Sequence, residues 1–296
     1  MTTANAEMLE KIKSGQGFIA ALDQSGGSTP KALKGYGIDE GEYSGDEEMF
    51  ALIHAMRSRI VTAPCFNGDK VIGAILFERT MDGEAGGKPI PTLLWERGVV
   101  PFLKVDKGLE AEADGVQLMK PNADLDALCE RAVAKSVFGT KMRSVVNLAN
   151  PVGVKAIVAQ QFAEAARIAA RGLVPIIEPE VNIKSPERDA ADRLLLAETL
   201  AALDAWTGAP VMLKLSLPTE AGLFQPLVDH PKVLRVVALS GGFARPEACV
   251  ELAKNPGIIA SFSRALLEDL RHQMNDDEFN ASLGSAIDEI HAASVA

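Results

Sequence analysis

Short apolar runs alternate along the chain with longer segments whose apolar residues recur at helical spacing. This alternation is typical of βα units, in which helices connect parallel strands. The pattern predicts eight strands, at residues 18–23, 71–77, 100–105, 143–148, 174–179, 211–215, 233–239 and 258–262. Eight such units in a chain of 296 residues favour an α/β fold, a (β/α)8 TIM barrel, over an open doubly wound sheet.

Two of the predicted helices have clear boundaries. The segment 151–172 has Pro151 in its first turn and Gly172 as its stop, and the segment 185–208 ends at Gly208. The tail, 276–296, predicts an extra amphipathic helix outside the barrel repeat. Further helices are expected after Asn122, Arg245 and Ser263. No linker, low-complexity tract or fixed-period repeat interrupts the pattern, so we expect a single domain over residues 1–296.

Composition and charge narrow the class of protein. Hydrophobic residues make up 47% of the chain and charged residues 24%, which is typical of a globular protein. A net charge of −10 argues against nucleic-acid partners and against attraction to acidic membranes. We expect neither a secretory signal nor a membrane span, because no apolar run approaches ~20 residues. The three cysteines are too far apart for a disulfide framework, which favours a reducing, cytoplasmic location.

Charged side chains fall late in several predicted strands. Residues two apart share one face of a strand, and the carboxyl ends of barrel strands build the active site. We therefore expect these acids and bases to meet at one mouth: Asp23, Lys104, Lys141, Arg143, Glu178, Glu180 and Lys214. Each one alone also fits a structural role, such as a lysine that reaches water from a strand end or a salt bridge. Their joint occurrence at corresponding positions favours a functional site.

Glycine and serine turns mark candidate anion sites. "LSGGF" follows the seventh strand and "SFSRAL" follows the eighth, where barrels often bind phosphate. Backbone amides of a glycine turn and the guanidinium of Arg264 are suitable ligands for that group. "DQSGGS" after the first strand offers a second turn, near which Lys107 could lie. Two anion sites around a central lysine suit a sugar with a phosphate at each end.

In this order, "GFIAALDQSGGS", "LKVDKG", "TKMRS", "VPIIEPE", "MLKLS", "LSGG" and "FSRAL" resemble class I fructose-1,6-bisphosphate aldolase, and the bacterial or algal members in particular. The resemblance covers most of the chain. It implies reversible cleavage of fructose 1,6-bisphosphate to dihydroxyacetone phosphate and glyceraldehyde 3-phosphate in glycolysis and gluconeogenesis. It also implies a metal-free lyase without cofactor, in which Lys214 forms a Schiff base with the ketose carbonyl. This phosphorylated ketose is the expected partner, and the sequence leaves open whether the chain is a monomer or a homo-oligomer.

The resemblance also implies a role for each residue that matches its motifs. Glu178 matches the general acid and base, with Glu180 beside it; Asp23 and Lys141 match groups that orient the substrate and the carbinolamine. The expected site for the phosphate nearest the ketone consists of Ser240, Gly241, Gly242, Ser261 and Arg264. The expected ligands of the distal phosphate and the substrate hydroxyls are Ser25, Ser28, Lys104, Lys107 and Arg143.

Three departures from the animal pattern are visible. Ala32 stands where animal enzymes carry an arginine for the distal phosphate, and Ser263 stands where a glycine is usual. The chain ends "HAASVA", without the C-terminal tyrosine that assists enamine protonation. We expect Glu178 or water to take over that proton transfer.

Two other readings of the sequence remain open. One is a different lysine-dependent enzyme, such as a transaldolase or an aldolase for a singly phosphorylated sugar, which would not need two anion sites. The other is a non-catalytic barrel that binds sugar phosphates, in which Lys214 only pairs with a glutamate. A metal-dependent aldolase is disfavoured, because the four histidines are scattered and none has ligand spacing.

Overall fold

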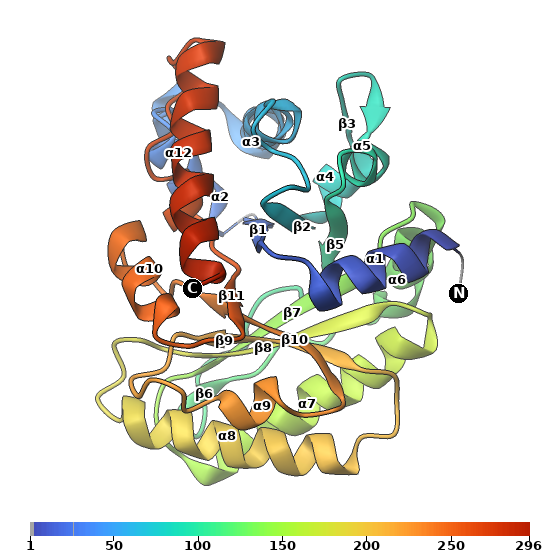
Figure 1. The fold of residues 1–296 in the computed structure, drawn as a ribbon, viewed down its shortest axis with the longest axis vertical. Coiled ribbons are helices and arrows are strands. Elements are labelled where there is room, and N and C mark those ends of the chain that lie inside the picture. The colour runs from blue at the N-terminus through green and yellow to red at the C-terminus, as the bar shows by residue number, and fades with distance from the viewer. Residues whose placement is uncertain (1–2, 26) are drawn as a thin grey trace.

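The structure, a computed structural model, describes residues 3–25 and 27–296 (Figure 1). Eight parallel strands follow one another around the sheet in chain order, which confirms the predicted barrel. They are β1 (Phe18–Leu22), β2 (Val71–Leu76), β5 (Val100–Lys104), β7 (Gly139–Val146), β8 (Val174–Val181), β9 (Val211–Ser216), β10 (Val233–Leu239) and β11 (Ile258–Ala260). The first and last strands meet where the Ala21 amide donates to the Phe262 carbonyl, at 3.0 Å.

Three short strands lie outside this ring. β6 (Val116–Gln117) pairs antiparallel with β7, and β3 (Glu84–Ala85) forms a hairpin with β4 (Lys88–Pro89). These strands belong to the loops that connect the barrel units.

Helices surround the barrel and α1 lies across one end of it (Figure 1). The helices are α1 (Thr3–Ser14), α2 (Thr29–Gly35), α3 (Gly45–Thr62), α4 (Glu78–Asp82), α5 (Ile90–Glu96), α6 (Leu125–Ala134), α7 (Pro151–Ala170), α8 (Arg188–Ala205), α9 (Gln225–Val228), α10 (Arg245–Ala253), α11 (Arg264–Leu267) and α12 (Asp276–Ser294), with a 3-10 turn at Glu40–Glu42. Pro151 is the first residue of α7, and Asn150 caps it by accepting from the Val152 and Gly153 amides. None of the helices among the described residues combines the length and apolarity that crossing a membrane requires.

Most predicted elements differ from the structure by one to three residues at their ends, and two differ more substantially in extent or position. β7 begins at Gly139, four residues before the predicted start. The prediction missed these residues because Lys141 is charged and breaks the apolar pattern, although its side chain is buried inside the barrel. The predicted C-terminal helix is present as α12, and it packs on β11 and β1 and against α10. It therefore occupies the place of the outer helix that follows the eighth strand.

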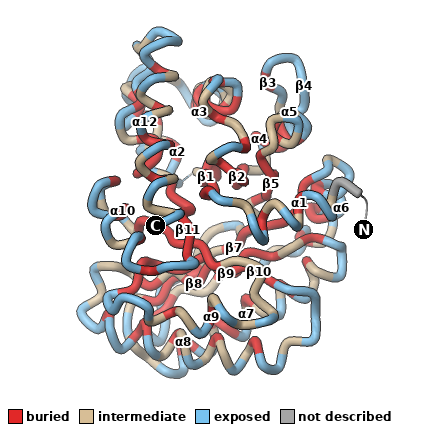
Figure 2. Tube along the Cα trace, in the orientation of Figure 1, coloured by how far each residue is buried: buried red, intermediate tan, exposed pale blue. Residues whose placement is uncertain are grey.

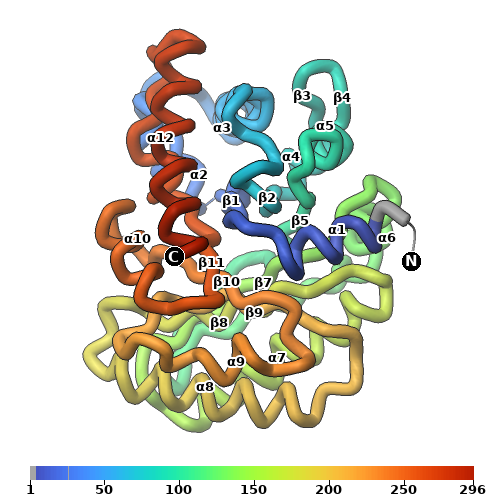
Figure 3. Tube along the Cα trace, viewed as in Figure 1, coloured from blue at the N-terminus to red at the C-terminus, as the bar shows by residue number. Residues whose placement is uncertain are grey.

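Helix α12 also contacts residues that follow α2 and residues of α3. Figure 3 shows α12, in red, beside α2, in blue. The ring of Phe279 on α12 contacts the ring of Tyr36, which follows α2, with centroids 6.4 Å apart. Arg59 of α3 pairs with Asp276 at the start of α12 at 3.0 Å. These contacts fasten the C-terminal helix beside the first and last strands.

The barrel wall separates two apolar layers. Figure 2 shows the strands as largely buried and the outer helices as alternating between buried and exposed residues. The outer layer lies between strands and helices and includes Leu213, Leu215 and Ile177. The inner layer includes Ile19, Ile176 and Met212, together with Met8 and Ile12 from α1. The apolar side chains of α1 therefore close the amino-terminal end of the barrel. Full burial of each such side chain stabilises the fold by about 1.5–3 kcal/mol.

The inner face changes from apolar to charged along the strands. Side chains alternate between faces of a strand, so Met212 is followed inside the barrel by Lys214, and Ile176 by Glu178. Ile19 and Ala21 precede Asp23 in the same way. The apolar residues fill the amino-terminal half of the barrel, and the next residue on the same face carries a charge into the other half.

Candidate active site

Four charged side chains meet inside the carboxyl-terminal half of the barrel. Glu178 of β8 bridges two lysines: its Oε1 lies 3.2 Å from the Lys214 Nζ, and its Oε2 lies 2.9 Å from the Lys141 Nζ. Lys141 of β7 also lies 2.6 Å from Oδ2 of Asp23, which follows β1. All four residues are buried, with at most 8% of each exposed. We call Asp23, Lys141, Glu178 and Lys214 the central cluster.

Electrostatics fix the charge states of two members of the central cluster. Burial alone would raise the pKa of Asp23, but the neighbouring charges of Lys141 and Lys214 outweigh it and hold that pKa well below its usual range. Burial alone would lower the pKa of Lys141, but the carboxylates of Asp23 and Glu178 raise it above its usual range. Asp23 is therefore an anion and Lys141 a cation at neutral pH.

A second layer of ion pairs surrounds the central cluster. Lys104 at the end of β5 donates to Oδ1 of Asp106 at 2.6 Å, and Arg143 pairs with Glu180 through its Nε. Burial opposes the charge of Arg143, but Glu180 and Glu178 together raise its pKa. Lys107, a predicted phosphate ligand, lies elsewhere: its amine is 3.1 Å from Glu78 on α4. The structure thus brings Lys104 and Arg143 close to the central cluster and leaves Lys107 in a half-exposed pair.

The turn after β10 has the backbone of an anion site. Gly241 and Gly242 have φ angles of +62° and +122°, which disfavour other residues. A Cβ at Gly242 would lie 3.3 Å from Nη2 of Arg264, so this guanidinium lies directly against the turn. Arg264 is exposed and has no hydrogen-bond or ion-pair partner among the residues that the structure describes. The buried Ser261 hydroxyl likewise lacks a partner within those ranges.

The loop after β1 is folded on itself through its two predicted site serines. The Ser25 amide donates to the Ser28 hydroxyl at 3.1 Å, and that hydroxyl lies 3.2 Å from the Ser25 carbonyl, to which it donates. This local bonding sets the turn that precedes α2. Ala32 lies in α2, one turn further along.

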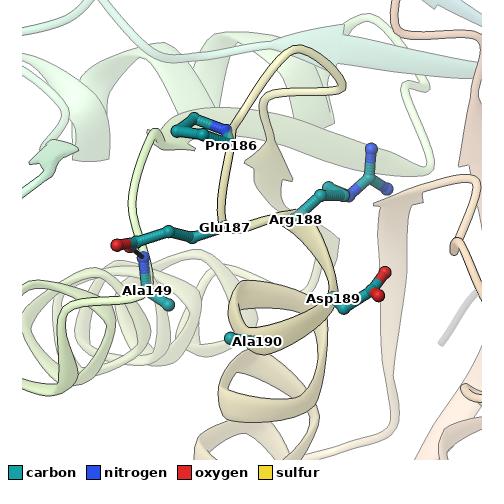
Figure 4. Close-up of a pocket in the computed structure, with 6 residues that line it drawn as sticks. All are labelled: Ala149, Pro186, Glu187, Arg188, Asp189 and Ala190. Atoms are coloured by element: carbon teal, nitrogen blue, oxygen red, sulfur yellow. Dashed lines mark hydrogen bonds between the residues drawn. The ribbon is translucent and has the colours of Figure 1, made fainter.

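Figure 4 shows a cavity of about 590 Å³ at the start of α8, lined by none of the predicted site residues. The Glu187 carboxylate reaches toward Ala149 and accepts its amide at 2.8 Å. Arg188 turns to the other side, where it pairs with Asp192 at 2.9 Å and donates to the Leu217 carbonyl. These polar groups fasten α8 to the barrel, and the lining of the cavity includes no member of the central cluster.

Sequence reasoning did not single out two buried side chains beside the central cluster. Gln161 of α7 accepts the Glu178 amide at 2.9 Å and donates to the hydroxyl of Ser144. Arg57 of α3 bonds the backbone and side chain of Gln24, the residue after Asp23. Each lies on the buried face of its helix. A polar residue at a position where the helical pattern expects an apolar one was the sequence feature that could have identified it.

The fold and the site together define a (β/α)8 barrel whose interior carries paired acids and lysines beside an unpaired arginine at a glycine turn. Residues 3–202 match the family model "Fructose-bisphosphate aldolase class-I". A curated protein of Porphyromonas gingivalis named "Fructose-bisphosphate aldolase class 1" is 54% identical over 292 residues, which are 98% of this chain and 99% of that protein. The chain therefore belongs to the class I fructose-bisphosphate aldolase family.

A solved structure supports the fold independently. It contains fructose-bisphosphate aldolase from Plasmodium falciparum, in complex with TRAP and a small-molecule inhibitor. It superposes with a TM-score of 0.79 over 99% of this chain and 95% of that one, at 19% sequence identity. The barrel is thus shared with an aldolase of very different sequence.

Proposed function

We propose that the chain cleaves fructose 1,6-bisphosphate reversibly to dihydroxyacetone phosphate and glyceraldehyde 3-phosphate through a Schiff base on Lys214. The observation that carries this proposal is the position of the Lys214 amine, buried inside the barrel 3.2 Å from one oxygen of Glu178. A nucleophile and an acid–base group in contact are the minimum that carbinolamine chemistry requires. We propose that residues 1–296 work as a single domain, because the barrel includes strands from both ends of the chain.

Ion pairing supports the choice of Lys214 over Lys141 as the nucleophile. An amine attacks a carbonyl only after it has lost its proton. Lys141 contacts two carboxylates and its pKa is raised, so it stays protonated. Lys214 contacts one carboxylate, and that carboxylate is the group placed to accept its proton. Lys141 then serves as a fixed cation beside the developing charges.

Glu178 is the proposed proton carrier of each covalent step. The amine of Lys214 adds to the ketone carbon, and the carbinolamine loses its oxygen as water with a proton delivered by Glu178. The iminium then accepts the electrons of the breaking carbon–carbon bond, while a carboxylate takes the proton of the adjacent hydroxyl. The aldehyde leaves, and the remaining enamine is protonated by Glu178 or water and then hydrolysed. Asp23 and Glu180 hold the lysine and arginine partners in position for these transfers.

Two anion sites are proposed on opposite sides of Lys214. The phosphate nearest the ketone would bind the amides of Gly241 and Gly242, the hydroxyls of Ser240 and Ser261, and the guanidinium of Arg264, which no carboxylate occupies among the described residues. The distal phosphate and the hydroxyls would bind near the second layer. That proposed set is Ser25, Ser28, Lys104, Lys107 and Arg143. Lys107 would have to leave Glu78 to take part.

Trapping of the Schiff base tests the proposal. Borohydride reduction in the presence of fructose 1,6-bisphosphate should add the mass of the reduced sugar to the peptide that contains Lys214. Lys214→Arg should abolish the adduct and reduce cleavage by roughly 10,000-fold or more. Lys184→Arg, on an exposed lysine outside the central cluster, is the matched control and should keep the adduct.

Absence of an adduct with both fructose 1,6-bisphosphate and fructose 1-phosphate would leave a binding barrel as the better interpretation. Equal cleavage of the two sugars would favour an aldolase for singly phosphorylated substrates. We propose that no metal ion is needed, so cleavage should persist in a chelator. We further propose a role in glycolysis and gluconeogenesis in the cytoplasm, where free thiols such as those of Cys65, Cys129 and Cys249 persist.

A further inference from the structure

The turns of the two proposed phosphate sites are joined across the seam of the barrel. β1 is joined to the segment after β11 by a backbone bond from the Ala21 amide to the Phe262 carbonyl. Next to it, Nε2 of Gln24 donates to the hydroxyl of Ser263 at 2.7 Å. Gln24 immediately precedes Ser25, and Ser263 immediately precedes Arg264. A side-chain bond therefore connects the loop of one proposed site to the turn of the other.

Arg57 sets the direction of the Gln24 amide. Its guanidinium donates to the Gln24 backbone carbonyl and, at 3.1 Å, to the side-chain Oε1. A guanidinium has donors only, so it selects the oxygen of the amide and turns Nε2 the other way, toward Ser263. Arg57 is itself fixed by a 2.9 Å bond to the Thr80 hydroxyl. The chain of bonds runs from α4 through α3 and the first loop to the turn after β11.

Among the described residues, the hydroxyl at one end of this connection does not cap a helix, and the guanidinium at the other end forms no ion pair. Ser263 is the N-cap residue of α11, yet its hydroxyl makes no capping bond and accepts from Gln24 instead. Arg57 is 1% exposed and lacks a carboxylate partner within ion-pair distance among the described residues. Burial lowers the pKa of Arg57 to about 10, with Asp23 acting in the opposite direction. Burial of such a cation is costly, and its hydrogen bonds here go to the Thr80 hydroxyl and to the Gln24 carbonyl and amide oxygens.

We propose that Gln24, held by Arg57 and bonded to Ser263, is a clamp that sets the separation of the two phosphate sites and so favours a sugar with two phosphates. This inference rests on the proposed function. Gln24 and Ser263 are positioning residues, because they act through Ser25 and Arg264.

A ratio of specificities tests the clamp. Ser263→Ala and Gln24→Met each remove the bond with little change of volume. Each should lower the ratio of kcat/KM for fructose 1,6-bisphosphate to kcat/KM for fructose 1-phosphate by about fivefold, the effect of one hydrogen bond. The double variant should match Gln24→Met, since Ser263→Ala removes no bond that Gln24→Met leaves in place. Ser263→Thr keeps the hydroxyl and should restore the ratio, and Ser14→Ala, on α1, should leave it unchanged.

Several outcomes would overturn the clamp. The bond would be merely structural if the ratio of kcat/KM values were unchanged, or if kcat/KM fell equally for both sugars. Additive effects of the two substitutions on this ratio would lead to the same conclusion. Failure of the proposed function gives a different result, namely neither cleavage nor an adduct at Lys214 in the unmodified protein. In that case the shifts in melting temperature caused by the two sugars replace kcat/KM, and Ser263→Ala should still reduce the preference for the bisphosphate.

Discussion

The central cluster and the turn at Arg264 differ in the burial and the ion pairing of their charged side chains. Within the central cluster, Asp23, Lys141, Glu178 and Lys214 are buried and each contacts an opposite charge within 3.2 Å. Arg264 is exposed and pairs with no carboxylate among the described residues. Acidic and basic side chains pair with one another inside the barrel, whereas the guanidinium of Arg264 has no carboxylate partner at the rim among the described residues.

This difference follows from what each region is proposed to do. Groups that transfer protons need fixed distances before the substrate arrives, and mutual ion pairs provide such preorganisation in a region of low dielectric constant. A group that captures an anion must instead be free of competing carboxylates. The chain combines both designs by burying one set of charges within β-strands and placing the other on a glycine turn and a short helix.

Substitution of Glu178 should break the central cluster most strongly. Glu178→Gln keeps the volume but removes the proton carrier, so kcat should fall about 100- to 10,000-fold. KM should change little, because the anion sites are intact. Steady-state kinetics with fructose 1,6-bisphosphate measure both quantities. Glu187→Gln, at the entrance of α8, is a control whose carboxylate bonds only the Ala149 amide among the described residues and should retain activity. Equal losses in kcat and in substrate affinity would show that Glu178 is structural.

Substitution of Arg264 should affect the other region by a smaller amount. Arg264→Gln removes a charged donor, and hydrogen bonds to charged groups are worth about 1.5–3 kcal/mol. KM should therefore rise about 10- to 100-fold, while kcat falls less. Arg193→Gln, on an exposed arginine paired with Glu220, is the matched control. Inorganic phosphate should inhibit the unmodified protein more strongly than the Arg264 variant; equal inhibition of both would remove Arg264 from the anion site.

The sequence predicted the barrel because period-two apolar runs and helical segments alternate eight times along the chain. It placed β7 too late, since the inward side chain of Lys141 interrupts the apolar run, and only a closed barrel shows that such a residue lies inside. It also assigned α12 to a position outside the repeat, because amphipathic spacing does not reveal which strands a helix covers.

The sequence also selected the members of the central cluster: Asp23, Glu178 and Lys214 each follow an apolar run, and Lys141 lies two residues before Arg143, on the same face of the strand. It could not assign their partners. The bridging of two lysines by Glu178 depends on the registers of β7, β8 and β9. The pairing of Lys107 with Glu78 depends on how α4 meets the loop after β5. Long-range contacts of this kind, including the bond from Gln24 to Ser263, leave no spacing signal in a single chain.

The smallest predicted effect concerns stability: how much the central cluster and a surface ion pair each contribute to the free energy of unfolding. Because the pKa of Asp23 is lowered in the folded protein, its charge stabilises the fold above the ordinary value near 3.9, and this stabilisation is lost as the pH falls further. Asp23→Asn should therefore lower the free energy of unfolding by about 1–3 kcal/mol at pH 6. The difference between the two proteins should begin to shrink below about pH 4 and disappear only as the pH falls through the lowered pKa of Asp23.

Urea unfolding at pH 6 and at pH 3 measures this difference. Glu220→Gln breaks an ion pair to Arg193 in which both side chains are more than half exposed, and should cost less than about 1 kcal/mol at pH 6. The contrast separates burial from mere pairing, because water screens the surface pair and not the central cluster. If the difference in the free energy of unfolding between Asp23→Asn and the unmodified protein stayed constant from pH 6 to pH 3, Asp23 would act through packing. The charge of the central cluster would then not contribute to its stability.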